Sequence, residues 1–291
     1  MDRYYEFAET RLKIQDHFTY TPDLAYEKFA VDPCSVDYTM KYQAVTSFPS
    51  EWIQGDLLYE CPSFKIIDRD HIEYRLFYDQ GVCYALGFLA ESKGWVYYLQ
   101  GGSLEQRIQS SVAHFNYMMF EKIMIQFQCV ILHASMIRYK NKMILFTGPS
   151  GVGKSTQAEL WNRYTGSRII NGDRVLLRKK NGLWHGFGLP MNGSSAICEN
   201  DAGEIQAIIV LEKGKKGNQS VRLSPGETLS RLYGEMTVNR WNEVFVRQVL
   251  DMTVSIALEV PVYLYRCSKS EEAVSVLEKI LREKRPDDNK R

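Results

Sequence analysis

The segment FTGPSGVGKSTQAEL, residues 146–160, contains the pattern GxxxxGK[ST] of a phosphate-binding loop. The glycines of such a loop let successive backbone N–H groups point at phosphate oxygens, and the following helix adds a favourable dipole. Lys154 is expected to reach the β and γ phosphates, and the Ser155 hydroxyl to bind Mg²⁺. The residues predicted to bind the nucleotide are Gly148, Pro149, Ser150, Gly151, Val152, Gly153, Lys154, Ser155 and Thr156.

The flanking sequence supports this interpretation over a chance match on a surface loop. An apolar run, 143–146, leads into the loop, and a helix-forming stretch, 155–164, leads out of it. The expected ligand is a purine nucleoside triphosphate with Mg²⁺. The guanine-binding motif NKxD does not occur in the sequence, which favours ATP, while ADP or pyrophosphate as the phosphate donor stays open.

Phosphate transfer also needs a carboxylate for the metal or for the proton of the acceptor. Two acids follow predicted strands: Asp173 after SRIIN and Gly172, and Glu212 after AIIVL. Only one short helix separates the loop from the strand before Asp173, so the end of that strand is expected beside the loop. Asp173 is therefore the preferred second acid, predicted to bind Mg²⁺ together with Ser155, and Glu212 is the alternative.

The rest of the chain divides by pattern into a β-rich N-terminal domain over residues 1–103, a connecting helix over 104–129, a catalytic domain over 130–285 and a disordered tail over 286–291. The first domain is expected to be a small antiparallel β domain, because period-2 alternation begins at Val36 and several short strands follow. The connecting helix is predicted from apolar residues three or four apart, namely Ile108, Val112, Phe115, Met119, Ile123 and Phe127.

Beyond the loop, strands alternate with helices, and Asn181-Gly182 predicts a β-hairpin turn. Ser224, Pro225 and Glu227 predict a capped helix start. The long segment 186–203 is either a flap that grips a substrate or an ordinary loop.

Composition excludes several classes of protein. The 291 residues carry 36 basic and 35 acidic side chains, a net charge of +1, so nucleic acid is not an expected partner. No apolar stretch approaches the length of a membrane span, and no basic-plus-apolar signal opens the chain, so a cytoplasmic protein without membrane contact is expected. The six cysteines show no CxxC spacing, which argues against zinc or a redox dithiol.

The run LHAS, a strand, GPSGVGKST, a short helix and then GDRV resembles the catalytic domain of HPr kinase/phosphorylase. It is also similar to related kinases of modified-peptide gene clusters, including the lasso-peptide kinases. The resemblance covers about residues 130–266. It implies an α/β fold in which the phosphate-binding loop lies on a mixed β-sheet, as in phosphoenolpyruvate carboxykinase, here preceded by the small β-rich domain.

The resemblance also implies residue roles. The loop binds the nucleotide phosphates, Asp173 serves Mg²⁺ and catalysis, and His133 lies near the transferred phosphate. This chain departs from the family at Gly172, where the family has the first of two adjacent acids, which is held to be the base. Either Asp173 performs both tasks, or the base comes from elsewhere, or the reaction differs. The family segment for the reverse phosphorylase reaction is not recognisable, so that activity stays open.

The expected function is an ATP- and Mg²⁺-dependent kinase that phosphorylates a Ser or Thr hydroxyl of a protein or peptide, with Lys154, Asp173 and His133 as catalytic residues. A small-molecule kinase acting on a hydroxy amino acid is the first alternative. A nucleotide-binding interaction module without catalysis is the second. A homo-oligomer is compatible with the resemblance, and the acceptor itself cannot be named.

Overall fold

The computed structural model describes residues 1–18, 23–101, 104–108, 110–191, 193–213 and 217–282. The tail predicted over 286–291 lies outside them. The chain forms two compact units: unit 1 is Met1–Gln128 with Asn239–Val246, and unit 2 is Cys129–Val238 with Arg247–Arg291. Within the described ranges, no helix is both long and apolar enough to cross a membrane.

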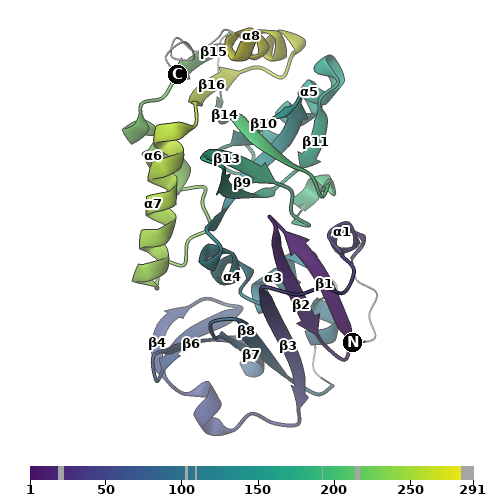
Figure 1. The fold of residues 1–291 in the computed structure, drawn as a ribbon. Coiled ribbons are helices and arrows are strands. Elements are labelled where there is room, and N and C mark those ends of the chain that lie inside the picture. The colour runs from purple at the N-terminus through teal and green to yellow at the C-terminus, as the bar shows by residue number, and fades with distance from the viewer. Residues whose placement is uncertain (19–22, 102–103, 109, 192, 214–216, 283–291) are drawn as a thin grey trace. The chain divides into compact units, whose positions relative to one another are not determined.

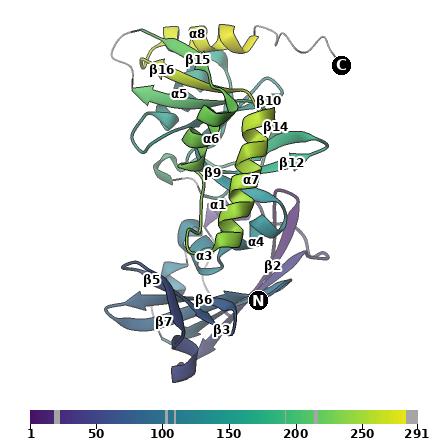
Figure 2. The same ribbon diagram turned by 90° about the vertical axis from the view of Figure 1, so that its left-hand side faces the viewer.

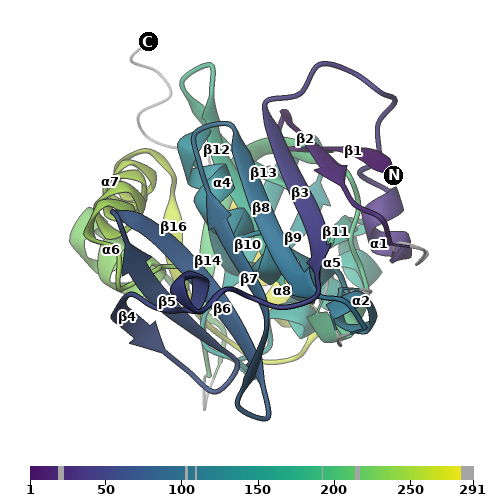
Figure 3. The same ribbon diagram turned by 90° about the horizontal axis from the view of Figure 1, so that it is seen from below.

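Unit 1 contains an eight-stranded sheet with the order β1-β2-β3-β8-β7-β6-β5-β4 (Figure 3). Its strands are β1 Asp2–Phe7, β2 Thr10–Gln15, β3 Tyr38–Val45, β4 Asp56–Glu60, β5 Phe64–Arg69, β6 Ile72–Asp79, β7 Val82–Leu89 and β8 Lys93–Leu99. The sheet is mixed rather than purely antiparallel as predicted, because β3 runs parallel to both β2 and β8. The connection from β2 to β3 is long enough for the crossover that a parallel pair requires.

The helices of unit 1 are short. They are α1 Leu24–Glu27, the 3₁₀ turn η1 Ser50–Ile53, α2 Leu104–Arg107, α3 Ser111–Tyr117 and α4 Phe120–Gln126. The single helix predicted over 104–129 is therefore wrong. Met119 has φ 51° and ψ 47°, a left-handed conformation that ends one helix before the next begins. Apolar spacing identified the buried face, since Phe115, Met119 and Ile123 are buried, but it could not identify this break.

Unit 2 contains a second eight-stranded mixed sheet, ordered β10-β9-β12-β13-β14-β16-β15, with β11 paired to β9. Its strands are β9 Cys129–Tyr139, β10 Lys142–Thr147, β11 Arg168–Asn171, β12 Arg174–Lys180, β13 Leu183–Phe187, β14 Ala202–Lys213, β15 Gln219–Arg222 and β16 Val262–Cys267. Because β10 also pairs with β14, the pairings close into a circuit through β10, β9, β12, β13 and β14. The predicted hairpin at Asn181-Gly182 is confirmed as the β12–β13 turn, with positive φ at both residues.

The helices of unit 2 are α5 Lys154–Thr165, the 3₁₀ turn η2 Gly193–Ser195, α6 Pro225–Tyr233, α7 Glu243–Glu259 (which starts within the residues assigned to unit 1) and α8 Glu271–Arg282. Figures 1 and 2 show α5 and α8 near the sheet, and a common apolar core joins them to it through Trp161, Tyr265 and Leu277. β10, β14 and β16 are parallel to one another, so their carboxyl ends share one edge. The chain leaves β10 at that edge, after Thr147, and enters the predicted phosphate-binding loop.

Candidate active site

The predicted phosphate-binding loop connects the carboxyl end of β10 to the first turn of α5. Gly148 has φ +134°, and a Cβ added there would lie 3.0 Å from the Leu211 carbonyl oxygen of β14. Gly153 has φ +115° and directly precedes α5. Both positions require glycine, because a side chain would be strained at each and would crowd β14 at the first. The loop backbone therefore passes close to β14, at the edge where the parallel strands end.

Lys154 is buried inside this loop, with 8% of its surface exposed. Its Nζ donates to the carbonyl oxygen of Gly148 at 2.8 Å and to that of Pro149 at 3.4 Å. Among the described residues it forms no ion pair. Burial lowers the pKa of Lys154, while the nearby charges of Glu235 and Asp173 act in the opposite direction. An ammonium group bonded only to carbonyls suits an anionic ligand.

His133 lies level with the start of the loop. In the β9–β10 ladder Ala134 is opposite Thr147, so His133 stands just beyond the carboxyl end of β10. The Thr147 hydroxyl donates to the His133 carbonyl oxygen at 2.9 Å, and the His133 N–H donates to the Glu235 carbonyl oxygen at 2.9 Å. The backbone of His133 is therefore fixed on both sides.

Asp173 occupies the junction between β11 and β12. The Asn171 side-chain oxygen accepts from the backbone N–H groups of Asp173 at 2.9 Å and Arg174 at 3.0 Å, which closes an Asx-type turn. The Ser135 hydroxyl donates to the Gly172 carbonyl oxygen at 3.0 Å. Asp173 therefore lies two residues beyond the end of β11, with its backbone N–H held by this turn.

The His133 ring lies between two carboxylates. Its Nε2 is 3.2 Å from Asp173 Oδ1, and its Nδ1 is 3.4 Å from Glu235 Oε2. The hydrogen bond from His133 is the main cause that lowers the pKa of Asp173, and the charges of Arg174 and Lys154 act in the same direction. Asp173 is thus held as a carboxylate, which can only accept hydrogen bonds.

Sequence reasoning missed Glu235. It follows α6 by two residues, and its neighbour Met236 forms a bridge with Leu132 of β9. This long-range bridge brings Glu235 to His133. The sequence YGEM carries no signal for it, because an acid after a helix is usually a solvated surface residue.

The long segment between β13 and β14 packs against Asp173. Gly193 of η2 has φ +55°, and a Cβ added there would lie 2.8 Å from the Asp173 Cβ. Further along, the Gly172 N–H donates to the Ile197 carbonyl oxygen at 3.2 Å, and the Glu199 N–H donates to that of Ile170 at 2.8 Å. The segment is therefore tied by backbone hydrogen bonds to β11 and to the turn that carries Asp173.

Glu212, the alternative acid, belongs to a different group of charges. Its carboxylate pairs with Arg266 at 2.5 Å and with Arg231 at 3.2 Å, at the carboxyl end of β14. These two arginines, Arg266 first, lower the pKa of Glu212. The structure joins His133 to Asp173 and Glu235, whereas Glu212 is already matched by two cations.

The side chains of the candidate site do not form a complete set of metal ligands by themselves. No group of three or more His, Cys, Asp or Glu side chains is arranged around a common metal position in the part of the chain that the structure describes. Mg²⁺ commonly enters phosphate-transfer sites with only one or two protein ligands, the remainder being phosphate oxygens and water. Ser155, in the first turn of α5, and Asp173 suit that mode of binding.

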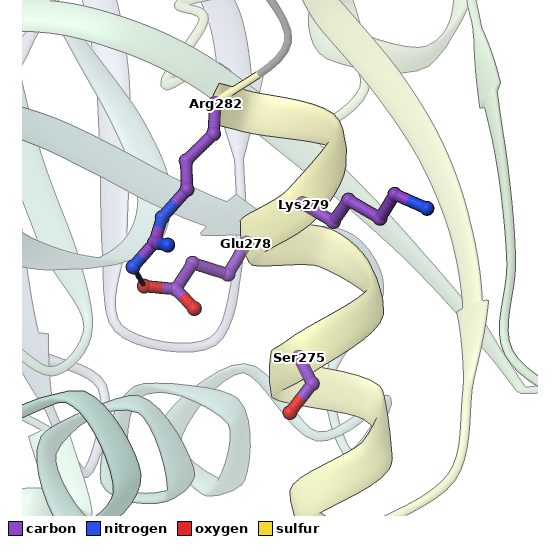
Figure 4. Close-up of a pocket in the computed structure, with 4 residues that line it drawn as sticks. All are labelled: Ser275, Glu278, Lys279 and Arg282. Atoms are coloured by element: carbon purple, nitrogen blue, oxygen red, sulfur yellow. Dashed lines mark hydrogen bonds and ion pairs between the residues drawn. The ribbon is translucent and has the colours of Figure 1, made fainter.

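Unit 2 has one hollow beside the phosphate-binding loop and another on α8. One, of about 390 Å³, borders the phosphate-binding loop and is lined by residues that include Gly151, Thr156 and Gln157. The other, of about 290 Å³, is lined only by Ser275, Glu278, Lys279 and Arg282 of α8, and the Glu278–Arg282 ion pair spans one side of it (Figure 4). The second hollow contains none of the candidate site residues.

No family model matches the chain, and no curated protein matches it. Among solved structures, it is similar to the HPr(Ser) kinase/phosphatase from Coxiella burnetii, with a TM-score of 0.31 and 16% identity. That match covers 52% of this chain and 88% of the other. A likeness of this size supports no statement about the fold or the function of this chain.

Proposed function

We propose that this chain is an ATP- and Mg²⁺-dependent phosphotransferase that transfers the γ-phosphoryl group to a Ser or Thr hydroxyl of a protein or peptide. The observation that carries the proposal is the juxtaposition of a buried Lys154, which lacks an ion-pair partner among the described residues, with the cluster Asp173, His133 and Glu235. Phosphate transfer needs a cation for the phosphates beside a carboxylate for the acceptor.

Each group has a role that follows from its position. The loop N–H groups and Lys154 hold the phosphates and stabilise the charge that develops during transfer. Bound Mg²⁺ would supply further neutralisation, with Ser155 and Asp173 as its protein ligands. Asp173, kept ionised by His133, orients the acceptor hydroxyl and accepts its proton.

Glu235 accounts for the acid that is missing at Gly172. Its carboxylate faces one nitrogen of the His133 ring while Asp173 faces the other. The two carboxylates together hold the His133 ring in one orientation. In this arrangement Glu235 positions His133, His133 positions Asp173, and the second carboxylate comes from a distant part of the chain rather than from the adjacent residue.

The acceptor class is tested with ATP labelled at the γ phosphate and a cell extract separated into a macromolecular and a small-metabolite fraction. The proposal expects label in a protein or peptide at Ser or Thr, and none when the enzyme carries Lys154→Ala. Label confined to the metabolite fraction would contradict a protein or peptide acceptor, although it would still support phosphate transfer from ATP.

A small-molecule kinase is the second candidate, because the segment around η2 packs directly against Asp173. A nucleotide-binding module is the third, favoured by Gly172 in place of an acid. It would bind ATP and Mg²⁺ without transfer to either fraction.

A further inference from the structure

The outer strand of the sheet in unit 1 leaves one edge of that sheet open. Among the described strands, β4 pairs with β5 alone, so the backbone groups on its other side have no strand partner (Figure 3). All five residues of β4 are exposed. An edge of this kind is a template on which another extended chain can add a strand.

The side chains along this edge are largely apolar. Four large apolar side chains within residues 53–59 are exposed: Ile53, Leu57, Leu58 and Tyr59. Natural edge strands are commonly protected by lysine or proline, and neither residue type occurs over 54–61. The two charged residues of β4, Asp56 and Glu60, lie at its ends. The middle of the strand is therefore an unprotected apolar edge.

β4 is an ordered strand rather than a loose turn. Leu57 is opposite Ile67 and Tyr59 is opposite Ile66, so Leu58 is the extra residue of a β-bulge. Ile66 and Ile67 are buried, and the Tyr59 ring stacks on the ring of Trp241 with centroids 4.6 Å apart. Packing against unit 1 thus holds the edge ready for an added strand.

The charges at the two ends of β4 differ. Glu60 pairs with Lys65 of β5 at 2.8 Å. Asp56 is directly opposite Asp68, and neither forms an ion pair with any residue that the structure describes. Acidic residues in this arrangement repel each other, because directly opposite Cβ atoms are only about 5 Å apart. A basic side chain on an added strand would offset this repulsion, so the charges favour a cationic occupant.

We propose that β4 docks an extended segment of the protein or peptide acceptor, which adds a strand beside it. Apolar side chains of the segment contact Leu57 and Leu58, and a lysine or arginine pairs with Asp56. The inference rests on the proposed function, since it takes the acceptor to be a protein or peptide. Main-chain hydrogen bonds supply affinity, and the apolar and acidic positions supply specificity.

Hydrogen exchange of the full chain tests the docking without ATP. The probe is a synthetic peptide of alternating valine and threonine with a lysine at each end. Its control is the same peptide N-methylated at the central residues, which cannot add a strand. We expect the probe, at about 1 mM, to slow amide exchange in β4 about tenfold and the control to have no effect. Unchanged exchange with the probe, or equal slowing by the control, overturns the proposal.

The same measurement separates a peptide from a second copy of this chain. Without the probe, exchange in β4 should be equal at low and high protein concentration. Protection that rises with protein concentration would assign the edge to a second copy and overturn the proposal. The Lys154→Ala chain should be protected by the probe like the unaltered chain, so a failure of phosphate transfer and a failure of docking are distinguishable.

Leu57→Lys removes an apolar contact and adds a charge that repels the probe. Val82→Lys is the matched control, because 60% of Val82 and 57% of Leu57 are exposed, but Val82 begins the inner strand β7. The affinity for the probe should fall about tenfold in the first variant and stay unchanged in the second. Equal affinity in the two variants overturns the proposal. If Leu57→Lys does not fold, the comparison of the two peptides on the unaltered chain remains decisive.

Discussion

The buried charge of Lys154 leads to the first prediction. Lys154→Ala should abolish phosphate transfer, because no other described cation lies inside the loop, whereas the fold should survive. The side chain gives the protein only two hydrogen bonds to carbonyls. Turnover is measured alongside the thermal unfolding midpoint. Near-normal turnover would remove the loop from the mechanism, and loss of folding would make the turnover result uninformative about it.

Asp173→Asn keeps the size of the side chain and removes its basicity. We expect the rate of transfer to fall by about 10²-fold or more, the lower range for a group that accepts a proton. Single-turnover kinetics with saturating ATP measure this step. A loss of only a few-fold would assign the base to Glu235 or Glu212 instead.

Glu235→Gln tests positioning rather than direct catalysis. The variant keeps an oxygen near His133 but loses the negative charge that faces Nδ1. We expect kcat to fall about tenfold, as for other supporting partners of site residues, with KM for ATP unchanged. The pH profile of kcat should also shift relative to the unaltered enzyme. A variant that loses only stability, with an unmoved profile, would reduce Glu235 to a structural residue.

At the scale of elements, η2 should control the position of Asp173. Gly193→Ala adds a Cβ about 3 Å from the Asp173 side chain, at a backbone angle that favours glycine. We expect kcat to fall at least about tenfold, since small displacements of a reacting group are costly. Gly182→Ala is the matched control, because φ is +79° there and the added Cβ meets nothing within 4 Å. Gly182→Ala should lose about 1 kcal/mol of stability, and Gly193→Ala should lose more because its Cβ also crowds Asp173. Equal activity of the two variants would show that η2 does not position Asp173 for catalysis.

The same scale shows why prediction from sequence succeeded in some elements and failed in others. The hairpin at Asn181-Gly182 and the capping box of Ser224 and Glu227 are confirmed, because both depend on neighbouring residues. The break between two helices at Met119 was not predicted, because the left-handed backbone conformation of this residue does not change the spacing of apolar residues. Strand β15 was also missed, because its short polar sequence, QSVR, has no clear alternation.

Some residues of the candidate site could be predicted from the sequence, and the contacts between them could not. The loop and Asp173 follow from local order along the chain, and the resemblance contributed His133. The contacts of His133 with the two carboxylates depend on the β9–β12 ladder and on the bridge from Met236 to Leu132. These are pairings between residues far apart in sequence, and no pattern in a single sequence specifies them.

At the scale of the molecule, unit 1 carries its own pH dependence. His114 of α3 is buried between the rings of Tyr26 and Tyr42, and its Nε2 has no partner among the described residues. Burial lowers the pKa of His114 from 6.5 to about 3. Below about pH 6.5 the unfolded chain binds a proton that the folded chain excludes.

The free energy of unfolding should therefore be unaffected by His114 above that pH. It should fall as the pH drops towards 3, and this residue contributes at most about 1.4 kcal/mol per pH unit to the decrease. His114→Phe keeps an aromatic ring and removes the titration. Urea unfolding between neutral and acidic pH should show a shallower slope in the variant, whatever its absolute stability. Identical slopes would show that His114 is not protonated on unfolding.

The central claim is that the loop around Lys154 directs the γ phosphate of ATP to a hydroxyl acceptor. Phosphorus NMR tests it most directly, with ATP, Mg²⁺ and a peptide and metabolite extract, using the unaltered chain and Lys154→Ala. We expect a new phosphoester signal that requires both the extract and Lys154. Unchanged ATP in every sample, with binding of ATP established separately, would contradict it and leave a nucleotide-binding module without catalysis.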